Sequence, residues 1–233
     1  PNIALQNPHL IGGLSFYVFS KLKKILVMID KDGDENYQPM LIPLDGGFPE
    51  PSFDNFFAEY RVHLGECDPE KGIAYFGAER RDIPMIETYR GDLKTGKLTK
   101  VAEYQFGLGV AAHSKDHNKL LLGTGYTVGD GVLCLWEKGK QKTLFGKLLE
   151  DRAEGESVPL NGLGSAVFSP SEKGALVVSS VFEDTYSLGY LDFSKPAELE
   201  PVQLKGVKHK GVGELMEAAH LRKDRYLLLF NID

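Results

Sequence analysis

The chain has 233 residues, of which 42% are hydrophobic and 26% are charged, and its net charge at pH 7 is −6. These proportions are ordinary for a globular protein, and the negative charge disfavours nucleic acid or an anionic membrane as the partner, since both attract basic surfaces. Because no run of about 18 apolar residues occurs, the sequence predicts no transmembrane helix.

Short apolar runs recur along the chain, and each follows a polar turn that ends in Lys or Arg. Their residues favour β-strands. The runs are residues 24–28, 71–76, 119–122, 173–178 and 225–229. With Ile25, Ile73, Leu120, Ala175 and Tyr226 as reference points, successive runs lie 48, 47, 55 and 51 residues apart. A period of about 40–50 residues is typical of a four-stranded propeller blade.

Each repeat also keeps the same internal order. A first strand precedes the run, as at residues 110–113 and 164–168, and a polar turn separates the two. A third strand follows the run, then a turn and a last short strand. The third strands are residues 40–45, 86–92, 132–136 and 187–192. This order predicts antiparallel sheets of four strands joined by short connections.

The predicted fold class is therefore all-β: a β-propeller of four-stranded antiparallel blades, with about four and a half blades in this chain. One such sheet cannot bury both faces alone, whereas sheets packed face to face around an axis can, and closing the ring protects their edges. The alternative is a β-sandwich, which gives no reason for one turn pattern to return five times.

We expect residues 1–233 to form a single propeller domain or a fragment of one. The expected blades are, approximately, residues 1–50, 51–107, 108–161, 162–206 and, in part, 207–233. The chain opens on Pro1 and ends at Asp233 inside a predicted hairpin, which is unusual for a complete domain. These observations predict a piece of a longer chain whose ring has seven or eight blades.

Helical periodicity is scarce. The best candidate is Val212–Leu221, where Glu214, Glu217 and His220 could share one polar face of a short helix. The two cysteines, Cys67 and Cys134, stand alone in strand-like runs, so we expect buried free thiols and neither a zinc ribbon nor a disulfide.

Two stretches resemble a known family. Residues 168–173 (FSPSEK) are similar to the FSPDGK turn of its blades, with Ser171 and Glu172 in place of Asp and Gly. Residues 30–38, followed by 41–47, resemble a segment common in its first blades. The family is the prolyl oligopeptidase family of serine peptidases, which includes acylaminoacyl and dipeptidyl peptidase-like enzymes; TolB-type propellers are more distant. The third repeat departs from the pattern at its turn, residues 114–118.

The resemblance implies a non-catalytic propeller that covers an α/β-hydrolase domain of the same protein and admits only peptides to its serine. The nucleophile of that family lies in a G-x-S-x-G elbow, and this sequence has none. We therefore expect no catalytic residue, no cofactor and peptide substrates for the parent protein. Scarce cysteine and the lack of a visible signal segment indicate the cytoplasm.

Residues 30–36 place oxygen side chains at alternating positions: Asp30, Asp32, Asp34 and Asn36. Such a set could bind a hard cation, but an EF-hand also needs Gly at position 6 and Glu at position 12, which are Glu35 and Leu41 here. The favoured interpretation is a hairpin turn in which Gly33 supplies a positive φ, and the metal site is the alternative.

Other polar groups offer weaker chemistry. Glu183 and Asp184 could face a channel and bind the amino terminus of a substrate, although surface charge alone also explains them. His113 and His117 have the spacing of a zincin pair but lie across a strand and its turn rather than on a helix.

Two further function classes remain open from the residues alone. One is an interaction module of TolB or WD-like type that binds a protein partner. The other is a propeller hydrolase, similar to glycosidases or lactonases, with a carboxylate or metal centre of its own.

Overall fold

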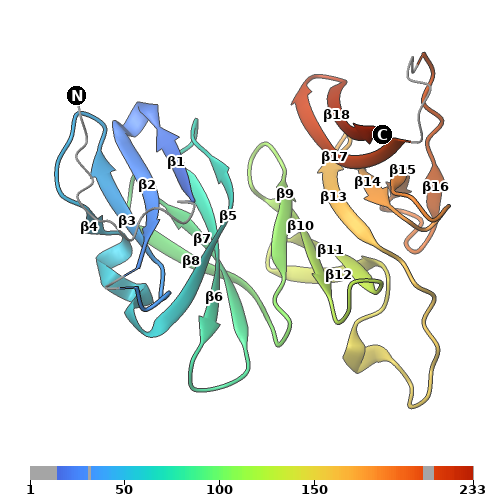
Figure 1. Cartoon of the computed structure of the whole chain (residues 1–233), viewed down its shortest axis with the longest axis horizontal. Helices are drawn as coiled ribbons and strands as arrows, with labels where there is room; N and C mark the ends of the chain where they lie inside the picture. Colours follow the sequence, from blue (N-terminus) through green and yellow to red (C-terminus); the bar gives the residue numbers. More distant parts are fainter. Residues whose placement is uncertain (1–14, 31–32, 207–212, 233) are drawn as a thin grey trace. The chain divides into compact units, whose positions relative to one another are not determined.

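The computed structural model describes residues 15–30, 33–206 and 213–232 (Figure 1). Its regular structure is mainly β-strand, with short 3-10 helices at η2 (Ser20–Leu22), η3 (Phe53–Glu59) and η4 (Leu149–Asp151). Within these ranges no helix is long and apolar enough to cross a membrane. The all-β prediction is confirmed. The chain divides into two compact units, Pro1–Gly109 and Val110–Asp233.

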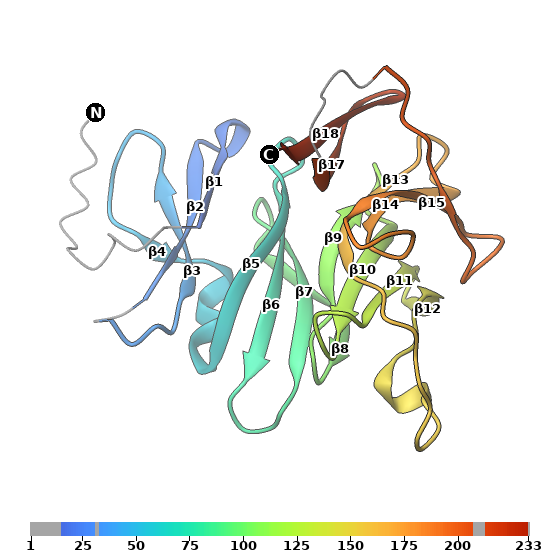
Figure 2. The same ribbon diagram turned by 45° about the vertical axis from the view of Figure 1, so that its right-hand side comes forward.

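The first unit holds two four-stranded antiparallel sheets whose strands follow one another in chain order. One sheet has β1 (Phe16–Phe19), β2 (Lys24–Ile29), β3 (Gln38–Pro43) and β4 (Glu50–Pro51). The other has β5 (Tyr60–Asp68), β6 (Ile73–Arg80), β7 (Ile86–Asp92) and β8 (Lys97–Tyr104). Figure 2 shows β5, β6 and β7 side by side.

The second unit repeats this arrangement. Its sheets are β9 (Gly109–His113), β10 (Lys119–Gly125), β11 (Gly131–Glu137) and β12 (Lys140–Phe145), then β13 (Leu163–Phe168), β14 (Gly174–Ser179), β15 (Ser187–Asp192) and β16 (Leu199–Pro201). A hairpin of β17 (Gly213–Arg222) and β18 (Arg225–Ile232) follows. Four complete sheets and one hairpin confirm the four and a half repeats expected from the sequence.

Each unit is held by apolar side chains packed between its sheets. In the second unit, Ala175 and Val177 pack with Leu121 on one side of β14, while Val178 packs with Leu215 on the other. Since neighbouring side chains of a strand point to opposite faces, both faces of this sheet are buried. In the first unit the corresponding core is rich in aromatic rings. It contains Phe19, Phe53, Phe57, Phe76 and Tyr89.

The hairpin register corrects one point of the repeat alignment. Lys24 pairs with Phe19, and Ile73 pairs with Asp68, so Lys24 and Ile73 hold equivalent positions at the start of their strands. The residue equivalent to Ile25 is therefore Ala74, one position beyond the Ile73 that the sequence suggested. The apolar character of both residues hid the shift.

The best helical candidate of the sequence, residues 212–221, is not a helix in its described part. From Gly213 onward this segment is β17, which pairs with β18 over its whole length. The register shifts between Leu215 and Glu217, at a β-bulge. The bulge turns Leu215 and Ala218 to the same buried side, and a spacing of three residues imitates a helical period.

The two cysteines are free thiols, as expected. Cys134 is buried and Cys67 is half-buried. Burial raises the pKa of both thiols, that of Cys67 to about 12. Since the thiolate is the reactive form, both cysteines are inert structural residues at neutral pH.

Candidate functional site

Three connections of the second unit are bonded to one another through their backbones and side chains. They are the β10–β11 loop (126–130), the β12–β13 connection (146–162) and the β14–β15 loop (180–186). The middle one is the long yellow segment in Figure 1 that carries η4. Because function concentrates in loops fixed by a rigid scaffold, this loop cluster is the candidate site.

An ion pair joins the first connection to the second. Nη1 of Arg152 lies 2.8 Å from Oδ2 of Asp130, and the two side chains are only 15% and 9% exposed. Nε and Nη2 of the same guanidinium donate to the carbonyl of Lys147, at 3.2 and 2.8 Å. The hydrogen bond from Arg152 lowers the pKa of Asp130, so the pair is charged at neutral pH.

Asn161 and Gly162 complete the links. The N–H of Asn161 donates to Gly129 at 2.7 Å, and its Nδ2 donates to the carbonyl of Gly131 at 2.8 Å. The carbonyl of Gly162 accepts the hydroxyl of Ser179 at 2.9 Å. The second connection is thus fastened on both sides, and the loop cluster is a pre-formed surface.

Cavities open beside these loops. One, of about 600 Å³, lies between the sheet of β9–β12 and the sheet of β13–β16, with Tyr126 and Val128 among its lining residues. No charged side chain lines it, and Gly123 in its wall leaves room, since a Cβ there would meet no atom within 4 Å. This cavity suits an uncharged, largely apolar group.

A second cavity, of about 310 Å³, contains both partners of an ion pair between Lys147 and Glu156. A third, of about 390 Å³, is lined by Glu183, Tyr186 and Leu215 among others. The predicted contact residues Glu183 and Asp184 are both exposed in the β14–β15 loop. The structure therefore brings Glu183 to a cavity wall, and the role of both carboxylates stays a prediction.

The described residues of the acidic segment, 30 and 33–36, follow β2 in the first unit. Asp30 is buried just after β2, and the carboxylate of Asp34 accepts the N–H of Asn36 at 2.9 Å. Gly33 has φ +77°, the left-handed conformation that the sequence predicted there. Asp32 lies outside the described residues. The metal alternative at these positions stays a prediction.

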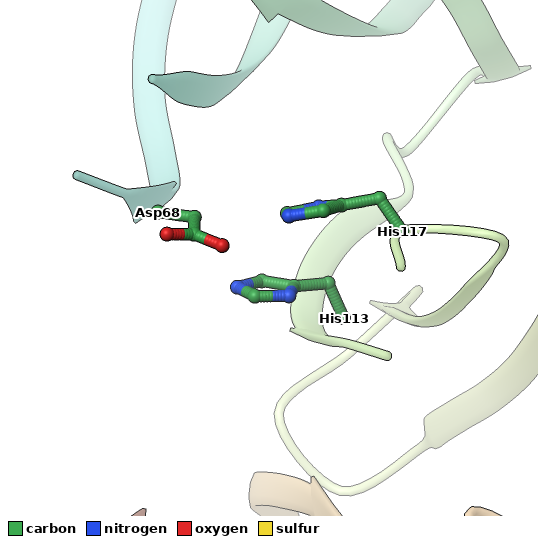
Figure 3. Close-up of side chains that lie close together, drawn as sticks. All are labelled: Asp68, His113 and His117. Carbon is green, nitrogen blue, oxygen red and sulfur yellow. The ribbon is translucent and has the colours of Figure 1, made fainter. Parts of the chain in front are cut away.

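A pair of histidines lies at the opening turn of the second unit. The rings of His113 and His117 stack with centroids 4.1 Å apart and planes inclined by 17° (Figure 3). The neighbouring hydroxyl of Ser114 donates to Asp116 at 2.8 Å, which is a turn contact. Asp68, drawn in the same figure, belongs to the first unit, where it accepts the N–H of Lys71 at 3.0 Å.

No protein-family profile and no curated protein sequence matches the chain. Solved structures do. A prolyl endopeptidase structure superposes with a TM-score of 0.60 and 12% identity over 89% of this chain and 30% of its own. Prolyl oligopeptidase B from Galerina marginata superposes with a TM-score of 0.56 and 10% identity, over 94% of this chain and 34% of its own. Oligogalacturonate lyase from Vibrio parahaemolyticus superposes with a TM-score of 0.53 and 13% identity, over 73% of this chain and 46% of its own.

The chain has a β-propeller fold. At identities this low the likeness shows the fold alone, and this chain spans between 30% and 46% of the structures named. The propeller predicted from the turn repeats is confirmed, and its blades are the four sheets and the final hairpin described above.

Sequence reasoning missed the residues that shape the loop cluster. Asp130, Arg152 and Asn161 drew no attention because each stands in a segment without a motif. One signal was available: the connection between the third and fourth blades runs from 146 to 162, far longer than the turns between strands of one blade. A long ordered connection in a repeat protein marks a surface loop with a role beyond linking strands.

Proposed function

We propose that this propeller is the non-catalytic domain of a prolyl oligopeptidase-type serine peptidase. It would gate the access of peptides to an α/β-hydrolase domain carried by the same protein. The observation that carries the proposal is the superposition of 89% and 94% of the chain on about a third of two such peptidases. The turn at residues 168–173 and the segment at 30–47 add sequence support.

The mechanism is steric selection. Blades packed around an axis leave a passage too narrow for folded proteins, and peptides enter as extended chains. The polar groups of the described loops favour a structural role. Arg152 donates a hydrogen bond to Asp130, and the hydroxyl of Ser114 donates one to Asp116. Bond chemistry is therefore assigned to the hydrolase domain.

Within this function, Glu183 and Asp184 contact the charged amino terminus of a peptide. Both carboxylates are exposed, and Glu183 shares a cavity of about 390 Å³ with Tyr186. An ammonium group in such a place would gain a charge-assisted hydrogen bond. We further propose that residues 1–233 form a single propeller domain or a piece of a seven- or eight-bladed one, in a cytoplasmic protein.

The test uses the full-length protein in which this sequence occurs. A fluorophosphonate reagent is expected to label one serine in a G-x-S-x-G segment outside residues 1–233, and hydrolysis is expected for short peptides but not for a folded protein. Absence of a labelled serine, with further blades as the only additional sequence, would favour the interaction module. Hydrolysis of a saccharide or lactone by residues 1–233 would favour the propeller hydrolase.

A second measurement addresses the carboxylates. Glu183→Gln is expected to raise KM for peptides with a free amino terminus and to leave KM for N-acetylated peptides unchanged. Glu200→Gln, at an exposed position on β16 of the same blade, is the control. Equal KM values for wild type and Glu183→Gln on free peptides would remove Glu183 from the proposal.

A further inference from the structure

The stacked rings of His113 and His117 in the third blade place two potential metal-ligating nitrogens close together. His113 ends β9 and His117 lies in the following turn, with ring centroids 4.1 Å apart. A ring nitrogen of one lies within 4.8 Å of a ring nitrogen of the other. Two nitrogens on one zinc ion stand at most about 4.2 Å apart, because each Zn–N bond is about 2.1 Å. Small side-chain rotations therefore bring the pair to chelating distance.

One hydrogen bond of His113 is of the kind that orients a metal-binding histidine. Its Nδ1 lies 3.0 Å from the backbone carbonyl oxygen of Ser114. A carbonyl only accepts, so the tautomer that makes this bond carries a proton on Nδ1, and in that tautomer Nε2 is the nitrogen that would bind the metal. This is the outer contact that orients metal-bound histidines in general: the second ring nitrogen donates to a carbonyl or carboxylate.

The turn that carries both rings is held by several contacts. The N–H of His117 donates to Ser114 at 3.0 Å, and the carboxylate of Asp116 accepts Asn118 through N and Nδ2, at 3.0 and 2.6 Å. The fourth blade adds Glu172, whose carboxylate accepts the N–H of Lys115 at 3.0 Å. Rings fixed in this way lose little conformational freedom on binding an ion.

We propose that His113 and His117 together bind one divalent transition-metal ion, of the zinc, nickel and copper class. Imidazole nitrogen suits these ions, whereas calcium and magnesium prefer oxygen ligands. The two nitrogens supply two positions, and water or other donors fill the rest. The site is independent of the proposed gating function, since it needs no hydrolase domain.

The test titrates ZnCl₂ into the metal-free 233-residue chain by isothermal calorimetry, with MgCl₂ as the comparison ion. We expect one zinc ion per chain and no heat from magnesium. His113→Gln and His117→Gln are each expected to weaken zinc binding at least about ten-fold, the effect of disturbing a metal-bound histidine. His63→Gln, at an exposed position on β5, is the matched control and keeps the affinity of the unchanged chain.

Folding of each variant is checked by circular dichroism without metal. Because His117 is buried, its replacement can prevent folding. If His117→Gln does not fold, the zinc affinity of His113→Gln alone tests the proposal. Zinc binding that is equal in the unchanged chain and in folded His113→Gln overturns the proposal, and so does the absence of zinc binding by the unchanged chain. An equal loss in His63→Gln assigns the zinc to another place and overturns it as well.

Discussion

Ser114 and Ser169 occupy the same position in consecutive blades. Each is buried directly after the first strand, and each hydroxyl accepts the N–H that opens the next strand, that of Lys119 at 3.0 Å and that of Gly174 at 3.2 Å. The two hydroxyls therefore close equivalent turns. The turn of the third blade, which departs in sequence from the family pattern, keeps its bonding.

Replacing Ser169 by Ala is expected to lower the free energy of unfolding by about 1–3 kcal/mol, because the buried N–H of Gly174 loses its side-chain acceptor. Urea unfolding followed by circular dichroism measures the change. Ser194→Ala is the control: its hydroxyl bonds to Asp192 at 2.7 Å in an exposed turn, so the expected loss is below about 0.5 kcal/mol. Equal losses in the two variants would contradict a structural role for the buried hydroxyl.

The fold could be predicted because it is built from repeats of one structural unit, the four-stranded sheet. Blades of one kind need the same strands and turns, so the apolar runs return with a regular spacing. The individual turn was harder to predict, since His117 and Glu172 take the left-handed conformation, with φ 58° and 53°, where the family pattern has Gly. In each turn a serine hydroxyl accepts a backbone N–H. This bonding offsets the conformational cost of the left-handed region for a residue other than glycine.

The loop cluster could not be predicted in the same way. Asp130 and Arg152 are far apart in the chain, and only the folded path of the connection at 146–162 brings them together. The cavity of about 600 Å³ depends on absent side chains, such as that of Gly123, and a glycine in a strand says little about which neighbours surround it. Pairings and voids of this kind depend on tertiary geometry rather than on local pattern.

Arg152→Met is expected to be strongly destabilising, by about 3–5 kcal/mol, because it leaves the carboxylate of Asp130 buried without its cation. Urea unfolding measures the free energy, and limited digestion with thermolysin, which cuts at apolar residues unaffected by the substitution, should cut the connection at 146–162 faster than in wild type.

Lys147→Met is the control for this pair. Lys147 bonds to Glu156 at 2.7 Å, but the two side chains are 39% and 31% exposed, so the expected change is about 0–1 kcal/mol. If Arg152→Met unfolds at the urea concentration of wild type, the buried ion pair does not stabilise the loop cluster.

Glu87 of the second blade is expected to make stability depend on acid pH. Burial raises the pKa of its carboxyl, but hydrogen bonds from Tyr89 (2.7 Å) and Lys100 (3.2 Å) outweigh it, and the net pKa lies below the ordinary 4.5. A lowered pKa in the folded state stabilises the protein above the unfolded pKa, and this contribution disappears as the pH falls through the folded value.

Glu87→Gln should therefore lower stability at pH 7 and flatten its decline below about pH 4.5, measured by urea unfolding at several pH values. Glu103→Gln removes the other carboxylate bound to Lys100, at 2.8 Å, but this one is 52% exposed, and its pH profile should follow that of wild type. A Glu87→Gln profile parallel to wild type throughout this range would show that the carboxylate contributes nothing.

Gly123 and Gly91 should respond in opposite ways to an added methyl group. A Cβ on Gly123 meets no atom within 4 Å. Gly123→Ala is therefore expected to be neutral or to stabilise the protein by about 0.4–1 kcal/mol, because alanine lowers the conformational entropy of the unfolded chain. A Cβ on Gly91 lies 2.9 Å from Cε1 of Phe53 and 3.0 Å from Cε2 of Phe76. Gly91→Ala should then cost about 1–3 kcal/mol by overpacking the aromatic core.

Gly77 provides the matched control, because Gly77 and Gly123 stand at the same distance from the strand starts Ile73 and Lys119. A Cβ on Gly77 first meets Ile86, at 4.0 Å, so Gly77→Ala should also be tolerated. The larger Gly123→Val separates the two positions: it fills part of the cavity of about 600 Å³, and its urea midpoint should stay at or above that of wild type. A loss beyond about 1 kcal/mol in Gly123→Val would mean that the space beside Gly123 is closed in solution.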